Sequence, residues 1–162
     1  MSIAPIASGD DVAACRDRID RWAASRLEEG GALVAVDRQP DALRWYLRLA
    51  GDEKDFITVW LTIRQRTLHH EAQVMPAPEA NVQATYEYLL RRSAELFQMR
   101  FCLGVEDALY LVGELPVGRV TDDELDRILG SSLAYVDDVF PTAMQIAFAG
   151  RYRRRPRSAA PR

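Results

Sequence analysis

The sequence predicts an α+β protein in which three helices surround a single antiparallel five-stranded sheet. Residues 43–75 contain three successive runs in which apolar and polar residues alternate, as half-buried strands require. Apolar residues recur at helical spacing before this stretch, after it and again near the C-terminal end. Two further short apolar runs between residues 100 and 115 predict a second hairpin. The predicted order of elements is therefore α-β-β-β-α-β-β-α.

Length and composition favour one domain, which we place at residues 1–150. A chain of 162 residues buries roughly 70% of the surface that it exposes when unfolded, so it needs no metal or disulfide for stability. No apolar run approaches the ~20 residues of a membrane helix. Residues 1–9 lack the basic start and the long apolar core of a secretory signal. We therefore expect no transmembrane segment and a cytoplasmic location.

The charge of the chain is distributed unevenly. The net charge is −3, yet residues 151–162 contain six arginines and no acidic residue. The body, residues 1–150, therefore holds 15 basic and 24 acidic residues and has a net charge of −9. An acidic body argues against nucleic-acid binding by the fold itself. We expect the arginine-rich tail to be disordered, with electrostatic contact to an acidic protein, nucleic acid or an anionic membrane as the alternative.

Capping residues mark where the helices begin. Ser8 is suited to cap the first helix, because its hydroxyl can accept a hydrogen bond from the first turn. Asn81 is expected to cap the second helix in the same way. Thr121 and Glu124 have the spacing of a capping box at the start of the third. Pro141 should kink the third helix or begin a new turn, because proline lacks the backbone N–H that a helix uses.

The three alternating runs determine how the strands pair. A loop over residues 51–55 and a two-residue turn at residues 65–66 place the aliphatic positions on one face, and a slip of one residue would mix the two faces. A short apolar run over residues 32–36 could also be extended, but the five-strand count leaves it out. The predicted core-face residues are Leu43, Trp45, Leu47, Leu49, Ile57, Val59, Leu61, Ile63, Leu68, His70, Ala72 and Val74.

The opposite, outer face combines aromatic and charged side chains. It presents Tyr46 and Trp60, with Phe56 at its margin, among arginines, threonines and His69. Two interpretations remain open. In one, the rings pack across strands against arginine stems on a half-exposed sheet; in the other, the face binds a partner, because aromatic residues and arginine are enriched where proteins meet. We select Tyr46, Arg48, Trp60 and His69 as candidate partner-binding residues.

No sequence motif predicts catalysis or metal binding. The chain lacks a Gly-x-Ser-x-Gly elbow, a phosphate-binding glycine loop, paired-cysteine zinc spacing and a His-Glu-x-x-His motif. His69 and His70 are neighbours on a strand and point to opposite faces, so they cannot hold one metal ion together. Cys15 and Cys102 are expected to be small buried apolar groups. We therefore predict no enzyme activity, no cofactor and no metal site.

A series of short pieces, taken in order, resembles the YbjN family. The pieces are RWYLRL (residues 44–49), ITVWL (57–61), MPAP (75–78), YEYLLRR (86–92), YLVG (110–113) and DELD (123–126) ahead of LG (129–130). The resemblance covers residues 42–150. Ser93 departs from the pattern, because an asparagine is expected after the double arginine. The resemblance implies a fold like that of type III secretion chaperones, and the family is labelled as bacterial sensory transduction regulators.

The resemblance leads to two functional hypotheses. Chaperones with this fold are typically acidic cytosolic homodimers that hold an extended segment of another protein, which implies a non-enzymatic, chaperone-like or adaptor-like role. The alternative is a signalling regulator that responds to a small ligand or a partner protein. The second helix favours a dimer, because Tyr88 and Leu96 widen its apolar surface. They lie off the predicted core-facing stripe, which consists of Val82, Tyr86, Leu89, Leu90, Ser93 and Phe97.

Overall fold

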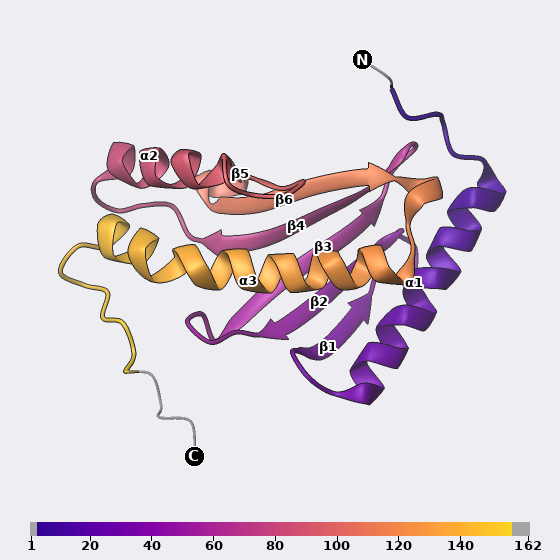
Figure 1. Ribbon diagram of the computed structural model, residues 1–162, viewed down its shortest axis with the longest axis horizontal. Coiled ribbons are helices and arrows are strands. Elements are labelled where there is room, and N and C mark those ends of the chain that lie inside the picture. Colours follow the sequence, from indigo (N-terminus) through magenta and orange to yellow (C-terminus); the bar gives the residue numbers. More distant parts are fainter. Residues whose placement is uncertain (1–2, 157–162) are drawn as a thin grey trace.

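The structure, a computed structural model, describes residues 3–156. Over these residues the chain forms three α-helices and one antiparallel sheet of six strands (Figure 1). The helices are α1 (Gly9–Glu29), α2 (Val82–Ser93) and α3 (Asp122–Ala147). The strands are β1 (Leu33–Arg38), β2 (Arg44–Ala50), β3 (Phe56–Ile63), β4 (Thr67–Met75), β5 (Arg100–Leu103) and β6 (Leu109–Pro116). Two short 3₁₀ turns, η1 (Val105–Asp107) and η2 (Val117–Arg119), flank β6.

The predicted α+β class, with three helices and a single antiparallel sheet, is confirmed, but the predicted count of five strands is wrong. The strands of the described chain lie in the order β1-β2-β3-β4-β6-β5, and the additional strand is β1 at one edge. A register shift between Leu33 and Ala35 leaves both Val34 and Ala35 exposed. Because of this bulge, β1 lacks the regular alternation that identifies a strand in a sequence. The likeness to type III secretion chaperones stays a prediction.

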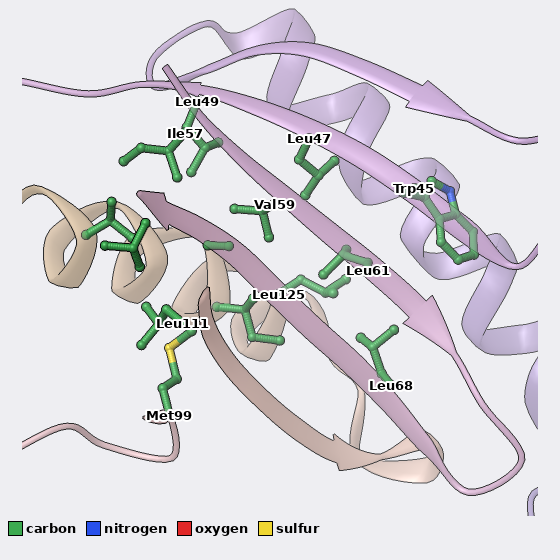
Figure 2. Close-up of a cluster of buried hydrophobic side chains, with 14 of the residues drawn as sticks. Trp45, Leu47, Leu49, Ile57, Val59, Leu61, Leu68, Met99, Leu111 and Leu125 are labelled. Carbon is green, nitrogen blue, oxygen red and sulfur yellow. The ribbon is translucent and has the colours of Figure 1, made fainter. Parts of the chain in front are cut away.

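The predicted register of the three-stranded meander is confirmed. Trp45 lies opposite Leu61 in the β2–β3 pair, and Ile63 lies opposite Leu68 in the β3–β4 pair. Side chains along the three strands alternate between buried and partly exposed. Figure 2 shows this buried set together with Leu125 of α3. Burying each side chain of leucine size contributes about 1.5–3 kcal/mol relative to leaving it exposed, so the register is strongly specified.

All three helices lie on one side of the sheet. α3 runs across β3 and β4, α1 packs beside β1 and against α3, and α2 packs against α3 and β5 (Figure 1). Among residues 3–156, no helix covers the opposite side. We call that side the open face. Its side chains include those of Ala35, Asp37, Arg44, Tyr46, Arg48, Phe56, Thr58, Trp60, Thr62, His69, Glu71, Gln73, Arg100, Cys102, Tyr110, Val112 and Glu114.

The helix ends confirm Ser8 and Thr121 as caps, but only half of the capping box predicted at Thr121 is formed, because the Glu124 carboxylate bonds to Arg127 instead. The Ser8 hydroxyl accepts the backbone N–H of Asp11 at 3.1 Å, and the Thr121 hydroxyl accepts that of Glu124 at 3.2 Å. Asn81 is not a side-chain cap: its backbone is left-handed, with φ 49°, and its amide donates instead to the carbonyl of Ile146 in α3 at 3.0 Å. Its side chain therefore ties the start of α2 to the end of α3.

α3 continues through Pro141 to Ala147, so the alternative of a new helix start at this proline is wrong. Residues 151–156 follow α3 and contact the body. Residues 157–162 lie outside the described residues. The division into one domain of residues 1–150 and a disordered tail therefore stays a prediction.

Two aspartates connect α1 to the rest of the core. Asp20 accepts the indole N–H of the buried Trp45 at 2.7 Å. Asp126 of α3 accepts the indole N–H of Trp22 at 2.8 Å and pairs with Arg26 at 2.7 Å. A buried indole N–H without a partner would be costly, so these bonds let two large aromatic side chains enter the core.

Candidate functional site

The centre of the open face is a row of aromatic rings. Tyr46 on β2 lies directly opposite Trp60 on β3, and their ring centroids are 6.0 Å apart at an interplanar angle of 70°. Trp60 also approaches Tyr110 of β6, with centroids 6.2 Å apart. All three side chains are partly exposed. Edge-to-face contacts of this kind stabilise a pair by about 0.5–1.5 kcal/mol beyond the area that they bury.

Charged groups are interleaved with these rings. The Arg44 guanidinium lies 5.6 Å from the Tyr46 ring centroid and 5.9 Å from that of Trp60. Arg44 also pairs with Glu71 at 3.2 Å, and the Nε2 atom of His69 lies 3.2 Å from the other Glu71 oxygen. A single carboxylate therefore joins an arginine and a histidine beside the aromatic row.

The structure brings three of the four predicted site residues together. Tyr46, Trp60 and His69 belong to the one network that Arg44 and Glu71 connect. Whether any of them binds a partner stays a prediction.

Arg48 lies apart from that network. Its guanidinium stands 3.8 Å from the ring centroid of Phe56, toward the loop between β2 and β3. The side chain of Phe56 is 46% exposed, so it is the most exposed aromatic side chain of the open face.

Sequence reasoning missed Tyr110. Its strand, β6, is distant in the chain and reaches Trp60 only because β6 pairs with β4. The alternation of Tyr110 with buried neighbours along β6 was the available signal. Without the order of the strands, however, that signal does not say which face the ring joins.

A second surface, which we call the α2–β5 patch, consists of exposed apolar side chains. Leu90 is 67% exposed, Leu103 is 52% exposed and Val82 is 41% exposed. Beside them a groove of about 180 Å³ runs between α2 and β5. β5 is an edge strand, so one side of its backbone has no partner strand within the described chain. The patch consists of the exposed Val82, Leu90 and Leu103, and the groove beside it is lined by the partly exposed Tyr86 and the buried Phe101.

This patch corrects part of the predicted orientation of the second helix: Leu89 and Tyr86 of the predicted stripe do pack on the core. Val82, Leu90 and Phe97 were expected to face the core but are exposed. Tyr88 and Leu96, expected to be the additional surface, pack against the core. α3 and β5 cover only part of the surface of α2. Both elements follow α2 in the chain, so the spacing of apolar residues within α2 does not show which of its sides they cover.

Two titratable groups buried inside the described fold have strongly shifted pKa values. His70 is 1% exposed, and burial, together with the nearby positive charge of Arg127, lowers its pKa to about 3. Burial raises the pKa of the Cys15 thiol to about 11. Cys102 is only partly buried, so the prediction of two buried cysteines is wrong for this residue.

Metal-ligating side chains are dispersed. Within residues 3–156, no three side chains of His, Cys, Asp or Glu gather closely enough to hold a metal ion. Nor is any helix in this range both long and apolar enough to cross a membrane. The expected lack of enzyme activity, cofactor and metal stays a prediction.

The fold and the open face define a small α+β protein whose sheet is covered by helices on one side and exposes aromatic and arginine side chains on the other. The chain belongs to the YbjN family: the model of this family, described as "putative bacterial sensory transduction regulator", matches residues 16–144. The predicted family is thereby confirmed.

Several mycobacterial proteins are similar to this chain. Uncharacterized protein ML2442 of Mycobacterium leprae is 34% identical over 110 residues, which are 67% of this chain and 60% of that protein. Uncharacterized proteins Mb0497 of Mycobacterium bovis and Rv0487 of Mycobacterium tuberculosis are each 32% identical over 108 residues, 67% of this chain and 59% of the relative. The matched region thus spans about three fifths of the length of these relatives.

Proposed function

We propose that the protein is a non-enzymatic, cytoplasmic binding protein that holds an extended polypeptide segment on the open face. The supporting observation is the row formed by Tyr46, Trp60 and Tyr110, which stays partly exposed because no helix of the described chain covers it. Aromatic rings offer large contact areas at a low cost in conformational entropy, and arginine adds charged hydrogen-bond donors. Such a face suits an adaptor or a chaperone.

The rings of this face are held in position before any partner arrives. Arg44 lies against both Tyr46 and Trp60 and is itself held by Glu71. A preorganised surface loses less side-chain entropy on binding than a mobile one. A measurement of peptide binding distinguishes this role from a purely structural one.

The binding test uses peptides selected by the protein itself. Random 12-residue peptides displayed on phage are selected on the wild-type chain and then measured by fluorescence anisotropy. We expect Trp60→Ala to weaken their binding at least about tenfold, which corresponds to about 1.4 kcal/mol. Phe97→Ala is the matched control, because this ring is 59% exposed but lies outside the open face. No enrichment of peptides, or equal binding by the two variants, would contradict the proposal.

We also propose that the protein is a homodimer and that the α2–β5 patch is its contact. Apolar groups as exposed as Leu90 and Leu103 are typical of surfaces that a partner covers. The free edge of β5 can pair with the same strand of a second copy, because an antiparallel edge pairs symmetrically with itself.

Sedimentation velocity tests the dimer. Leu90→Asp should produce monomers, because the substitution places a carboxylate in the contact. Leu27→Asp, at a position of α1 that is 40% exposed, should leave dimers intact. A wild-type chain that is monomeric at micromolar concentrations would refute this part of the proposal.

A second candidate function is a signalling regulator that binds a small ligand. One observation favours it besides the family description: a cleft of about 460 Å³ whose lining includes Arg100 and Arg119. Glu114 and Glu124 also line this cleft, so it presents both signs of charge. Neither arginine forms an ion pair within residues 3–156, so their guanidinium groups can still bind a carboxylate or phosphate. A panel of anionic metabolites that raises the melting temperature would support this function, and loss of the rise in Arg119→Ala would locate the site.

A further inference from the structure

The segment that follows α3 folds back onto the body. The backbone N–H groups of Arg151 and Tyr152 donate to the carbonyl of Phe148 at 2.9 and 3.0 Å, which turns the chain at the end of the helix. The Tyr152 ring then packs edge-to-face on Phe140 of α3, with centroids 5.9 Å apart at 84°. Figure 1 shows the segment passing the end of the sheet where β2 and β3 are joined.

Two consecutive arginines of this segment each form a bidentate ion pair with a carboxylate. The Nε atom of Arg154 donates to one Glu53 oxygen at 3.0 Å, and its Nη2 atom donates to the other. Both terminal nitrogens of Arg155 contact Asp55, one of them at 2.9 Å. The planar guanidinium matches a carboxylate in this geometry, so the contacts carry orientation as well as charge.

The loop that supplies these carboxylates is positioned by α3 and β4. Asp137 accepts backbone N–H groups of Asp52, Glu53 and Lys54 at 2.7, 3.1 and 3.0 Å. The Lys54 ammonium donates to the carbonyl of Gln73 at 2.6 Å. None of these bonds involves the C-terminal segment. The backbone of the loop that carries the acidic side chains is therefore held in place whether or not arginines are bound.

We propose that Glu53, Asp55, Glu79 and Phe140 form a receptor for short arginine-rich segments that carry an aromatic residue, and that residues 151–155 fill it as a built-in competitor. We call these four residues the strap site. Arg151 contributes the contact with Glu79. A basic segment of a partner protein gains access to the strap site only by displacing residues 151–155. This role is separate from the open face and does not depend on the function proposed for it.

Displacement is feasible because the holding contacts are largely at the surface. The Arg155 side chain is 75% exposed and its partner Asp55 is 54% exposed, so this ion pair is weak and screened by salt. The Arg154 side chain is 46% exposed but its partner Glu53 is only 10% exposed, so salt screens this pair less. The body without its tail carries a net charge of −9, which attracts basic segments over several ångströms.

The test measures binding of a labelled peptide, Gly-Arg-Tyr-Arg-Arg-Arg-Pro, to full-length chains by fluorescence anisotropy at low salt. This peptide copies residues 150–156. Arg154→Glu places two carboxylates together and removes the Arg154 contacts that hold the segment on Glu53, so we expect this variant to bind the peptide at least about tenfold more tightly than wild type. Arg153→Glu is the matched control: it makes the same change of charge one residue away, and Arg153 forms no side-chain hydrogen bond or ion pair within residues 3–156.

A second substitution separates the receptor from general electrostatics. Adding Glu53→Gln to the Arg154→Glu chain should abolish the gain in affinity, because the bidentate acceptor is lost. Equal affinities for wild type, Arg153→Glu and Arg154→Glu would overturn the proposal. An equal gain in both single variants would also overturn it, because net charge alone would then explain the binding.

Discussion

Acidification should destabilise the protein through His70. This side chain is 1% exposed, and its pKa is lowered from 6.5 to about 3, first by burial and then by the nearby charges of Arg127, His69 and Arg100. Its surroundings allow little adjustment, because a Cβ placed on Gly113 would already lie 2.5 Å from the imidazole Cε1 atom. The folded chain therefore holds this histidine neutral.

The sign and size of the effect follow from proton binding. Between the two pKa values the unfolded chain binds one more proton at this site than the folded chain does. The free energy of unfolding therefore falls as the pH falls, by up to about 1.4 kcal/mol per pH unit below 6.5. At about pH 5 the loss reaches about 2 kcal/mol, or roughly 4–8 °C in melting temperature. Above 6.5 this contribution to stability is fully present.

Urea unfolding of wild type and His70→Gln at several pH values measures this effect. Every other titrating group is common to the two chains, so the difference between their slopes isolates His70. We expect the variant to be less stable near neutral pH but to lose about 2 kcal/mol less between about pH 6.5 and pH 5. Parallel slopes for the two chains would refute the reasoning.

Three further predictions concern other parts of the fold. Gly113→Ala should lower the free energy of unfolding, measured in urea, by about 1–3 kcal/mol. The added Cβ would meet the His70 ring and a backbone carbonyl oxygen, the latter at 2.6 Å. An unchanged free energy of unfolding would mean that the backbone moves to accommodate the Cβ. Asp137→Asn should cost about 1–3 kcal/mol, because three backbone N–H groups lose a charged acceptor, and an unchanged urea midpoint would contradict this. Ellman's reagent should label the folded chain at Cys102 well before Cys15, since Cys15 is 4% exposed, and Cys102→Ser should remove the fast phase.

The pairing of β2, β3 and β4 could be predicted because alternation was unbroken along all three strands. A one-residue slip would have moved residues such as Leu47 and Val59 out of the core, so only one register was acceptable. β1 was considered as a short extended run but left out of the predicted sheet, because its bulge exposes two consecutive residues, Val34 and Ala35. A local irregularity such as this bulge interrupts the two-residue alternation by which a strand is recognised in a sequence.

The candidate site was predictable only where its residues come from adjacent strands. Tyr46 and Trp60 are opposite each other in a hairpin, so the sequence placed them together. Tyr110 joins them across β4, and this contact depends on the order of strands in the sheet. The exposed face of α2 and the docked Arg154 were missed for the same reason, because their neighbours lie far away in the chain.

The indole N–H signals of the three tryptophans test most directly whether the open face binds a polypeptide. Trp22 and Trp45 donate to aspartates inside the fold, whereas Trp60 lies on the open face. A selected peptide titrated into ¹⁵N-labelled protein should shift the Trp60 signal and leave the other two in place. Saturable binding that leaves the Trp60 signal unmoved would contradict the proposed function.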